Sequence, residues 1–222
     1  MLACTATRAS AVVIVFARAP LAGRVKTRLA ARLGAAGAAS LHRRLLRAAL
    51  DAASASRCGP VELHATASHA WLRAVSRKRK ITLRLQRGRD LGERMARATR
   101  AALRRHRRVV LIGSDCPELG PREIARAARW LAGGADAVLA PAHDGGYALI
   151  ALRSPAEFLF RGMPWGGDQV YGETIARLAR AGCRARSLGA VSDIDRPEDL
   201  ARLRWLSYST VARRHFLKLR AS

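Results

Sequence analysis

The sequence has few aromatic residues, few acids and very few lysines, and each shortage narrows what the protein can be. Aromatic residues make up only 5% of the 222 positions, so a core must draw mainly on the aliphatic part of a 50% hydrophobic composition. Acids number 16 against 41 basic residues, which gives a formal net charge of +25, and only four of those basic residues are lysines. This composition suits one α/β domain that attracts polyanions without specificity.

Cysteine and long apolar segments are also scarce. Cys4, Cys58, Cys116 and Cys183 lie far apart, without the paired spacing of a zinc site or a disulfide framework. No apolar run approaches the ~20 residues that a membrane span requires. The short apolar stretch after residue 10 is closed by Arg18, so we interpret it as a strand and not as a secretory signal. These absences predict a soluble, cytoplasmic protein with no membrane span.

Strand-like and helix-like segments alternate along the chain. Apolar runs predict strands, and apolar residues at helical spacing predict helices between them. The expected strands are 12–16, 61–66, 81–85, 109–113, 137–140, 147–152 and 184–188, and the expected helices are 41–50, 91–103, one opening at Pro121, 169–181 and 197–206. Strands separated by helices indicate a mostly parallel central sheet flanked by helices, in a single domain over residues 11–206. Residues 207–222 are expected to form a C-terminal helix or tail.

In an open α/β sheet, binding and catalytic residues collect in the loops beyond the carboxyl ends of the strands. The first such loop runs from Pro20 to Leu29 and combines Gly23, Lys26 and Arg28 ahead of a helical stretch. This pattern suits anion binding at a helix start, although an ordinary basic turn would look the same. It is not a P-loop, because Val25 stands where that motif needs glycine.

Acids follow two further predicted strands. Asp115 directly follows the strand 109–113, where it could hold a hard cation such as Mg²⁺ or Mn²⁺, or only cap the helix near Pro121. Asp193 and Asp195 alternate, so both point to one side. The Pro197 segment after them has the residues of a helix start, so capping explains part of this motif.

Two glycine pairs lie in other loops. Asp144-Gly145-Gly146 joins two predicted strands, and Asp-Gly is a strong hairpin signal that alone explains these glycines. The same glycines would also let the backbone approach a ligand closely. Trp165-Gly166-Gly167-Asp168 precedes a predicted helix and is ambiguous in the same way.

Together these segments resemble a known family. They are FARAPLAGRVKTRLAARLG, LGERMARAT, VVLIGSDCPEL, APAHDGGYALIAL, MPWGGDQVYGETI and DIDRPEDLARL, and they extend over nearly all of residues 12–206. In this order they resemble the bacterial GT-A-like nucleotide-diphospho-sugar transferases, some of which are known as arsenosugar-biosynthesis glycosyltransferases. The resemblance implies a Rossmann-like GT-A fold that binds a nucleotide-sugar or nucleotide together with a small-molecule acceptor.

The resemblance also implies roles for particular residues. Gly23, Lys26, Thr27 and Arg28 would bind the diphosphate, and Asp115, Asp193 and Asp195 would hold Mg²⁺ or Mn²⁺ beside the nucleotide. Gly145, Gly146, Tyr147, Trp165 and Glu93 would face the sugar or acceptor. The chain departs from the family pattern at Arg196, which stands where relatives have threonine, and at Gly166-Gly167, which replaces Ser-Thr.

The implied reaction is metal-dependent transfer of a sugar from a nucleotide-diphosphate donor. A divalent ion between carboxylates would neutralise the leaving diphosphate, with Lys26 adding fixed positive charge. A carboxylate must accept the proton of the acceptor if the configuration inverts, and Asp144 is the first candidate, ahead of Asp168 and Glu93.

Other functions fit parts of the sequence. The segment AGRVKTRL also resembles the start of phospholactate guanylyltransferase-like enzymes, so nucleotidyl transfer to a phosphorylated metabolite is the main alternative. A non-catalytic nucleotide-binding protein is another. The basic stretches 73–89 and 100–108 would bind nucleic acid without sequence preference, but no motif for specific nucleic-acid binding accompanies them.

Overall fold

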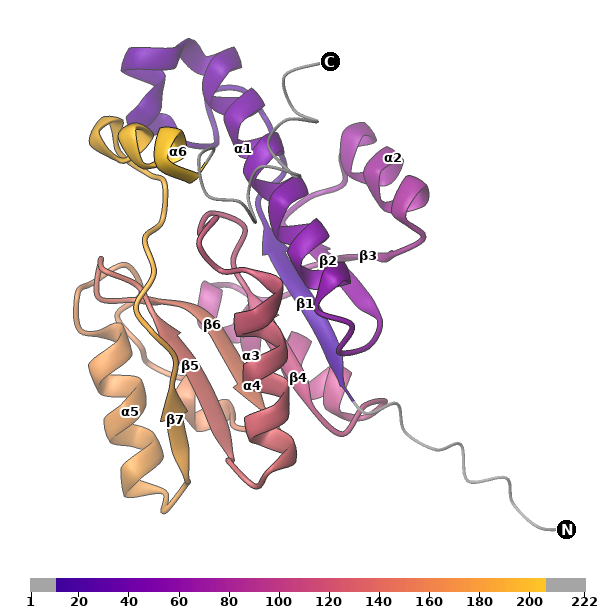
Figure 1. Cartoon of the computed structure of the whole chain (residues 1–222), viewed down its shortest axis with the longest axis vertical. Coiled ribbons are helices and arrows are strands. Elements are labelled where there is room, and N and C mark those ends of the chain that lie inside the picture. Colours follow the sequence, from indigo (N-terminus) through magenta and orange to yellow (C-terminus); the bar gives the residue numbers. More distant parts are fainter. Residues whose placement is uncertain (1–10, 207–222) are drawn as a thin grey trace, which may run out of the picture.

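The protein is a seven-stranded sheet with helices on both faces (Figure 1). The structure is a computed structural model that describes residues 11–206, apart from the side chains of 204–206. The strands are β1 (Val12–Ala17), β2 (Val61–Ala65), β3 (Thr82–Leu85), β4 (Val109–Ile112), β5 (Ala137–Pro141), β6 (Tyr147–Leu152) and β7 (Ala185–Ser187). The helices are α1 (Ala30–Ala55), α2 (Ala70–Arg79), α3 (Leu91–Leu103), α4 (Pro121–Ala132), α5 (Val170–Arg180) and α6 (Leu200–Leu206). Short 3-10 turns η1 (Thr27–Leu29), η2 (Glu157–Leu159) and η3 (Pro197–Asp199) complete the chain.

The strand order is β3-β2-β1-β4-β6-β5-β7, and the sheet is parallel except for β6. Strand β6 runs antiparallel to both of its neighbours, β4 and β5, while the other paired strands run parallel. The chain segments that follow β1, β4, β5 and β7 therefore leave the sheet at one edge. The tip of the β5–β6 hairpin reaches the same edge.

Two apolar layers sandwich this sheet. Alternate residues of the central strands point to opposite faces, so Val13 and Val15 pack with α1, α2 and α4, while Val12 and Ile14 pack with α3 and α5. The central strands are buried on both sides, which explains why they appear in the sequence as unbroken aliphatic runs.

A third, smaller cluster fixes the loop that follows β1. Leu29 after the loop and Leu41 and Leu45 of α1 pack around Ile194, which lies between Asp193 and Asp195. This contact holds the start of α1 against the segment that leads from β7 to α6, and Figure 1 shows these two helices side by side.

The predicted α/β fold with a mostly parallel sheet is confirmed, and helix 91–103 has the predicted bounds. Helix α2 was not predicted, because seven of its ten residues are basic or small and only Leu72 and Val75 are buried apolar positions. Helix α1 begins well before residue 41, at Ala30, and passes a kink at Gly34, where φ is 69°. The predicted C-terminal helix or tail at 207–222 lies outside the described residues.

Candidate active site

A cleft of about 480 Å³ opens at the sheet edge where the parallel strands end. Its walls come from the ends of β1 and β4, the β5–β6 hairpin, the loop around Trp165, the segment after β7 and the start of α3. Several residues that were singled out in the sequence line this cleft: Asp115, Asp144, Gly146, Tyr147, Trp165, Asp193 and Asp195. The fold thus gathers side chains from four separate loops, as expected for a site beyond the carboxyl ends of the strands.

Lys26 lies at the centre of the polar cluster beside the cleft. Its Nζ is 3.0 Å from Oδ2 of Asp115 and 3.7 Å from Oδ1 of Asp195, and its side chain is only 3% exposed. The guanidinium of Arg28 donates to the other carboxylate oxygen of Asp195 at 2.7 Å. Asp115 and Asp195 therefore lie at the same end of the sheet, joined by an ammonium group.

The backbone also connects the two acidic segments. The amide of Ile194 donates to the carbonyl of Asp115 at 3.0 Å, and the amides of Asp195 and Arg196 both donate to the Asp199 carboxylate. Asp199 therefore provides the cap at this helix start, which leaves the side chain of Asp195 to Lys26 and Arg28. Asp115 caps no helix, because α4 begins after Gly120 without a side-chain cap.

His42 of α1 also belongs to the site, although it was not predicted from the sequence. It is buried, and its Nε2 donates to the carbonyl of Arg18 at 3.1 Å, while Nδ1 faces Oδ1 of Asp115 at 3.7 Å. Burial alone would raise the pKa of Asp115, but the His42 ring and the Lys26 ammonium hold it well below its ordinary range. No sequence signal marks His42, since a histidine on the buried face of a helix is usually a core residue.

The remaining two acids of the cleft lie near each other. Burial and then the negative charge of Asp144 raise the pKa of Asp193 above its ordinary value. Asp144 accepts a hydrogen bond from the amide of Gly146 at 3.0 Å, which fixes its carboxylate at the hairpin tip. Cys116 lies in the same wall, and burial raises the pKa of its thiol, so it stays protonated.

Aromatic rings form the opposite wall. Trp165 contacts Tyr147 edge to face at 6.3 Å between ring centroids and stacks on Phe160 at 6.5 Å. Gly92 at the start of α3 makes room for this arrangement, because a Cβ there would lie 2.7 Å from Nε1 of Trp165. Two arginines also line the cleft without having been predicted, Arg18 after β1 and Arg94 on α3.

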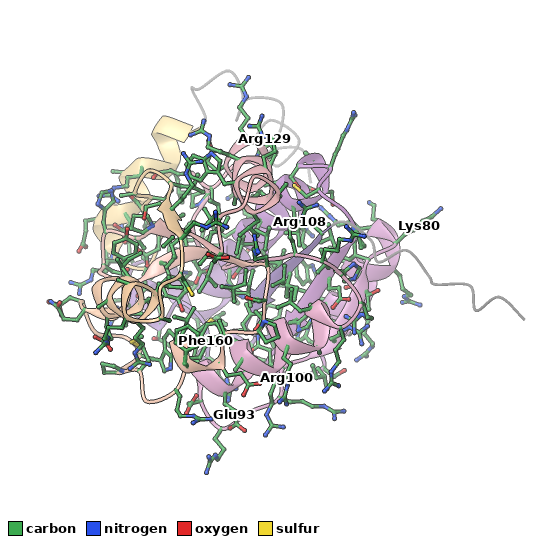
Figure 2. All side chains as sticks on the ribbon, turned by 90° about the horizontal axis from the view of Figure 1, so that it is seen from below. Lys80, Glu93, Arg100, Arg108, Arg129 and Phe160 are labelled. Carbon is green, nitrogen blue, oxygen red and sulfur yellow. The ribbon has the colours of Figure 1, made fainter. Side chains whose placement is uncertain are left out.

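Glu93 is not part of this cleft. It lines a second cleft on the other side of α3, with Arg97, Arg100 and Phe160, and Figure 2 shows Glu93 and Arg100 at the rim of the molecule. A hydrogen bond from the Arg89 amide and another from Arg97 lower its pKa to about 2. Gly23, Thr27 and Gly145 do not line the cleft either, and Gly23 and Thr27 are exposed in the first loop.

The arrangement around Asp115 and Asp195 does not fit a metal ion held between them. Mg²⁺ and Ca²⁺ lie about 2.0–2.6 Å from their oxygen ligands, and Nζ of Lys26 already takes that space. Among residues 11–206, no group of three or more histidine, cysteine or acidic side chains is suited to hold a metal ion. In the same part of the chain, no helix is long and apolar enough to cross a membrane.

Comparison with known proteins places the chain in a family. Residues 49–167 match the family described as "Uncharacterized protein conserved in bacteria (DUF2064)". The chain is also 31% identical to a protein of Desulfovibrio desulfuricans described as a "putative nucleotide-diphospho-sugar transferase", over 95% of this chain and 94% of that one, with a TM-score of 0.84. The chain therefore belongs to this bacterial family, as the resemblance in the sequence implied. No curated protein matches it.

More distant structures share the fold. A cytidylyltransferase from Leptospira borgpetersenii is 13% identical with a TM-score of 0.60, and the match covers 89% of this chain and 86% of that one. Rv0371c from Mycobacterium tuberculosis, in complex with manganese, is 18% identical with a TM-score of 0.52, over 87% and 97% of the two chains. The Rossmann-like GT-A fold that the resemblance in the sequence implied is confirmed.

Proposed function

We propose that this protein transfers a sugar from a nucleotide-diphosphate donor to a small-molecule acceptor. One observation carries the proposal: the cleft at the carboxyl edge of the sheet brings the Lys26–Asp115–Asp195 cluster together with Asp144, Asp193 and an aromatic wall. The name of the 31% identical protein from Desulfovibrio desulfuricans supports the same kind of reaction.

The charges of the cleft suit a diphosphate leaving group. Departure of a nucleoside diphosphate builds negative charge, which fixed cations stabilise without reorganising. Arg18 lines the cleft, and Arg28 keeps 65% of its side chain exposed beside it. In this proposal the two arginines bind the diphosphate, while Gly23 and Thr27 shape the loop that carries Arg28.

Asp144 is the proposed general base of an inverting transfer. Its carboxylate lies at the hairpin tip in the cleft, next to Asp193, whose pKa is raised by burial and by the charge of Asp144. The charge of a neighbouring carboxylate makes uptake of a proton by this pair more favourable, which suits removal of a proton from an acceptor hydroxyl. Trp165 and Tyr147 line the cleft together with Gly146, and in this proposal they offer the apolar faces on which sugar rings pack.

Nucleotidyl transfer is the second candidate. The observation in its favour is the basic loop from Gly23 to Arg28, which leaves β1 directly and resembles the start of guanylyltransferase-like enzymes. That reaction would use the same cleft but release pyrophosphate. The resemblance in the sequence implies Mg²⁺ or Mn²⁺ for both reactions, but with Lys26 between Asp115 and Asp195 such an ion would have to bind elsewhere in the cleft.

A screen for ligand-dependent thermal stabilisation tests the proposal. A ligand that binds only the folded protein raises its apparent stability by about 2.7 kcal/mol at a hundredfold excess over Kd. We expect nucleoside diphosphates and nucleotide-sugars to raise Tm by several degrees, each measured with Mn²⁺ and with EDTA. The variant Asp144→Asn should keep the shift and lose turnover.

The product separates the two candidates. Sugar transfer releases a nucleoside diphosphate, whereas nucleotidyl transfer from a triphosphate releases pyrophosphate. Stabilisation by triphosphates with pyrophosphate release would favour the second candidate. Absence of any shift across the nucleotide panel would remove both enzyme assignments.

A further inference from the structure

Lys26 is held in an unusual conformation. Its backbone lies in the left-handed region with φ of 49°, a conformation that favours glycine and not lysine. Its side chain is only 3% exposed. Such conformations are strained and persist where the surrounding structure enforces them, often at functional sites. Arg57 and Lys80 share this backbone conformation at exposed positions, so the feature particular to Lys26 is the burial of its ammonium between two carboxylates.

Every carboxylate oxygen of the two acids beside Lys26 faces a donor or cation. Oδ2 of Asp115 faces Lys26, and Oδ1 accepts from the Ser114 hydroxyl at 3.1 Å and faces the His42 ring. Oδ1 of Asp195 faces Lys26 and Oδ2 accepts from Arg28. A divalent ion between these acids would have to displace the ammonium, because two cations cannot occupy the same position.

The surroundings hold Lys26 in place. The amide of Leu29 donates to the Lys26 carbonyl at 2.9 Å, and the buried Leu29 side chain packs with Leu45 and Ile194. The segment that carries Asp195 is bonded in turn to Asp115 through the Ile194 amide. The backbone of Lys26, the two acidic segments and α1 are thus joined, which fixes the point from which the lysine side chain reaches the acids.

We infer that Lys26 is the built-in cation of this site: its ammonium takes the position between Asp115 and Asp195 that a divalent ion would otherwise need. On this inference the lysine positions the two acids, and the chain binds a diphosphate at this edge without a divalent ion between them. The inference deepens the proposed function, but the cation assignment itself depends only on the geometry of Lys26.

Titration with Mn²⁺ alone, followed by electron paramagnetic resonance of the free ion, tests this assignment. The variant Lys26→Met keeps the length of the side chain and removes its charge. We expect this variant to gain one Mn²⁺ site that the wild-type protein lacks, at least tenfold tighter than any Mn²⁺ binding by the wild type. The double variant Lys26→Met/Asp195→Asn should lose that site again.

Two controls keep the result interpretable. Lys78→Met, at an exposed position on α2, should bind Mn²⁺ as the wild-type protein does. Lys26→Arg retains a cation and should not gain the site. If Lys26→Met fails to fold, Asp195→Asn in the wild-type background still decides the matter, because it should leave Mn²⁺ binding unchanged.

The inference is overturned if the wild-type protein binds one Mn²⁺ that Asp115→Asn or Asp195→Asn abolishes. It is also overturned if a folded Lys26→Met gains no site. A Mn²⁺ site that depends on Asp193 and survives Asp195→Asn leaves the assignment of Lys26 standing. None of these titrations contains a nucleotide, so failure of the proposed transferase function would not alter them.

Discussion

At the scale of single residues, the contact between the tip of the β5–β6 hairpin and the start of α5 requires glycine at position 145. Its φ is +87°, and a Cβ at this position would lie 2.1 Å from the carbonyl oxygen of Asp168. The amide of Tyr171 in α5 donates to the carbonyl of Gly145 at 2.9 Å, so the hairpin and the start of α5 touch through backbone. The Asp144-Gly145-Gly146 motif is therefore more than a turn signal, because it brings two walls of the cleft together.

We expect Gly145→Ala to destabilise the protein by about 2 kcal/mol or more, since it adds a steric clash to the conformational cost. The matched control is Gly166→Ala, whose φ of +90° is similar but whose Cβ would meet nothing within 4 Å. That control should lose only about 1 kcal/mol, from backbone strain alone. Urea denaturation measures the free energy of unfolding of both variants. Equal losses would show that the contact with Asp168 does not affect stability.

At the scale of elements, β2 carries a buried charge that its neighbours neutralise. Glu62 accepts from Nε2 of His64 on the same strand at 2.9 Å, from Arg84 of β3 at 3.0 Å and from Arg105 after α3 at 2.7 Å. Burial by itself would raise the pKa of Glu62, but His64, Arg105 and Arg84 lower it to about 2. This network attaches the edge strand β3 and the end of α3 to the central sheet.

Replacement of Glu62 by glutamine should cost about 2 kcal/mol of stability at pH 7, because the arginines lose a charged acceptor. A carboxyl whose pKa is lowered on folding stabilises the protein above its unfolded pKa, and this contribution is lost as the pH falls through the folded value. The difference between wild type and Glu62→Gln should therefore shrink between pH 4.5 and pH 2.

Denaturation midpoints measured across that pH range check this prediction. Glu198→Gln, at an exposed acid of η3, serves as the control and should change stability by no more than about 0.5 kcal/mol at any pH. A loss for Glu62→Gln that stays constant down to pH 2 would contradict the network account.

At the scale of the whole molecule, the net charge of +25 calls for an explanation that the cleft does not supply. Residues 73–108 are dense in arginine and contain only two acids, Asp90 and Glu93. Most of these arginines are exposed, on α2, β3, α3 and the loops that join and follow them, and Figure 2 shows Lys80 and Arg100 extended at the periphery. They form a solvated basic surface around the β3 edge of the sheet.

We expect this surface to bind polyanions without sequence preference. Contacts to phosphates release counterions, so the affinity for duplex DNA should fall about a hundredfold or more between 50 and 200 mM salt. Fluorescence anisotropy with two duplexes of unrelated sequence should give the same Kd at each salt concentration. Tight binding to one sequence at high salt would instead indicate a specific nucleic-acid function.

The sequence by itself determined the order and kind of most elements. Unbroken aliphatic runs fixed β1 and β4 because a central parallel strand is buried on both faces, and this placed the loop of Asp115 at the carboxyl edge. It also placed Asp193 and Asp195 beyond the last strand. Helix α2 could not be predicted in this way, because its few apolar residues are interspersed with basic ones and form only a short stripe.

Tertiary structure alone decided which side chains meet. Lys26 lies 89 positions from Asp115 and 169 from Asp195, and no local pattern reveals that the fold brings its ammonium between them. His42 was not predicted, yet it faces Asp115 from the buried side of α1. Glu93 was predicted at the site, yet it lines the second cleft. Local periodicity follows from backbone geometry, whereas such contacts depend on how loops and helices pack together in space.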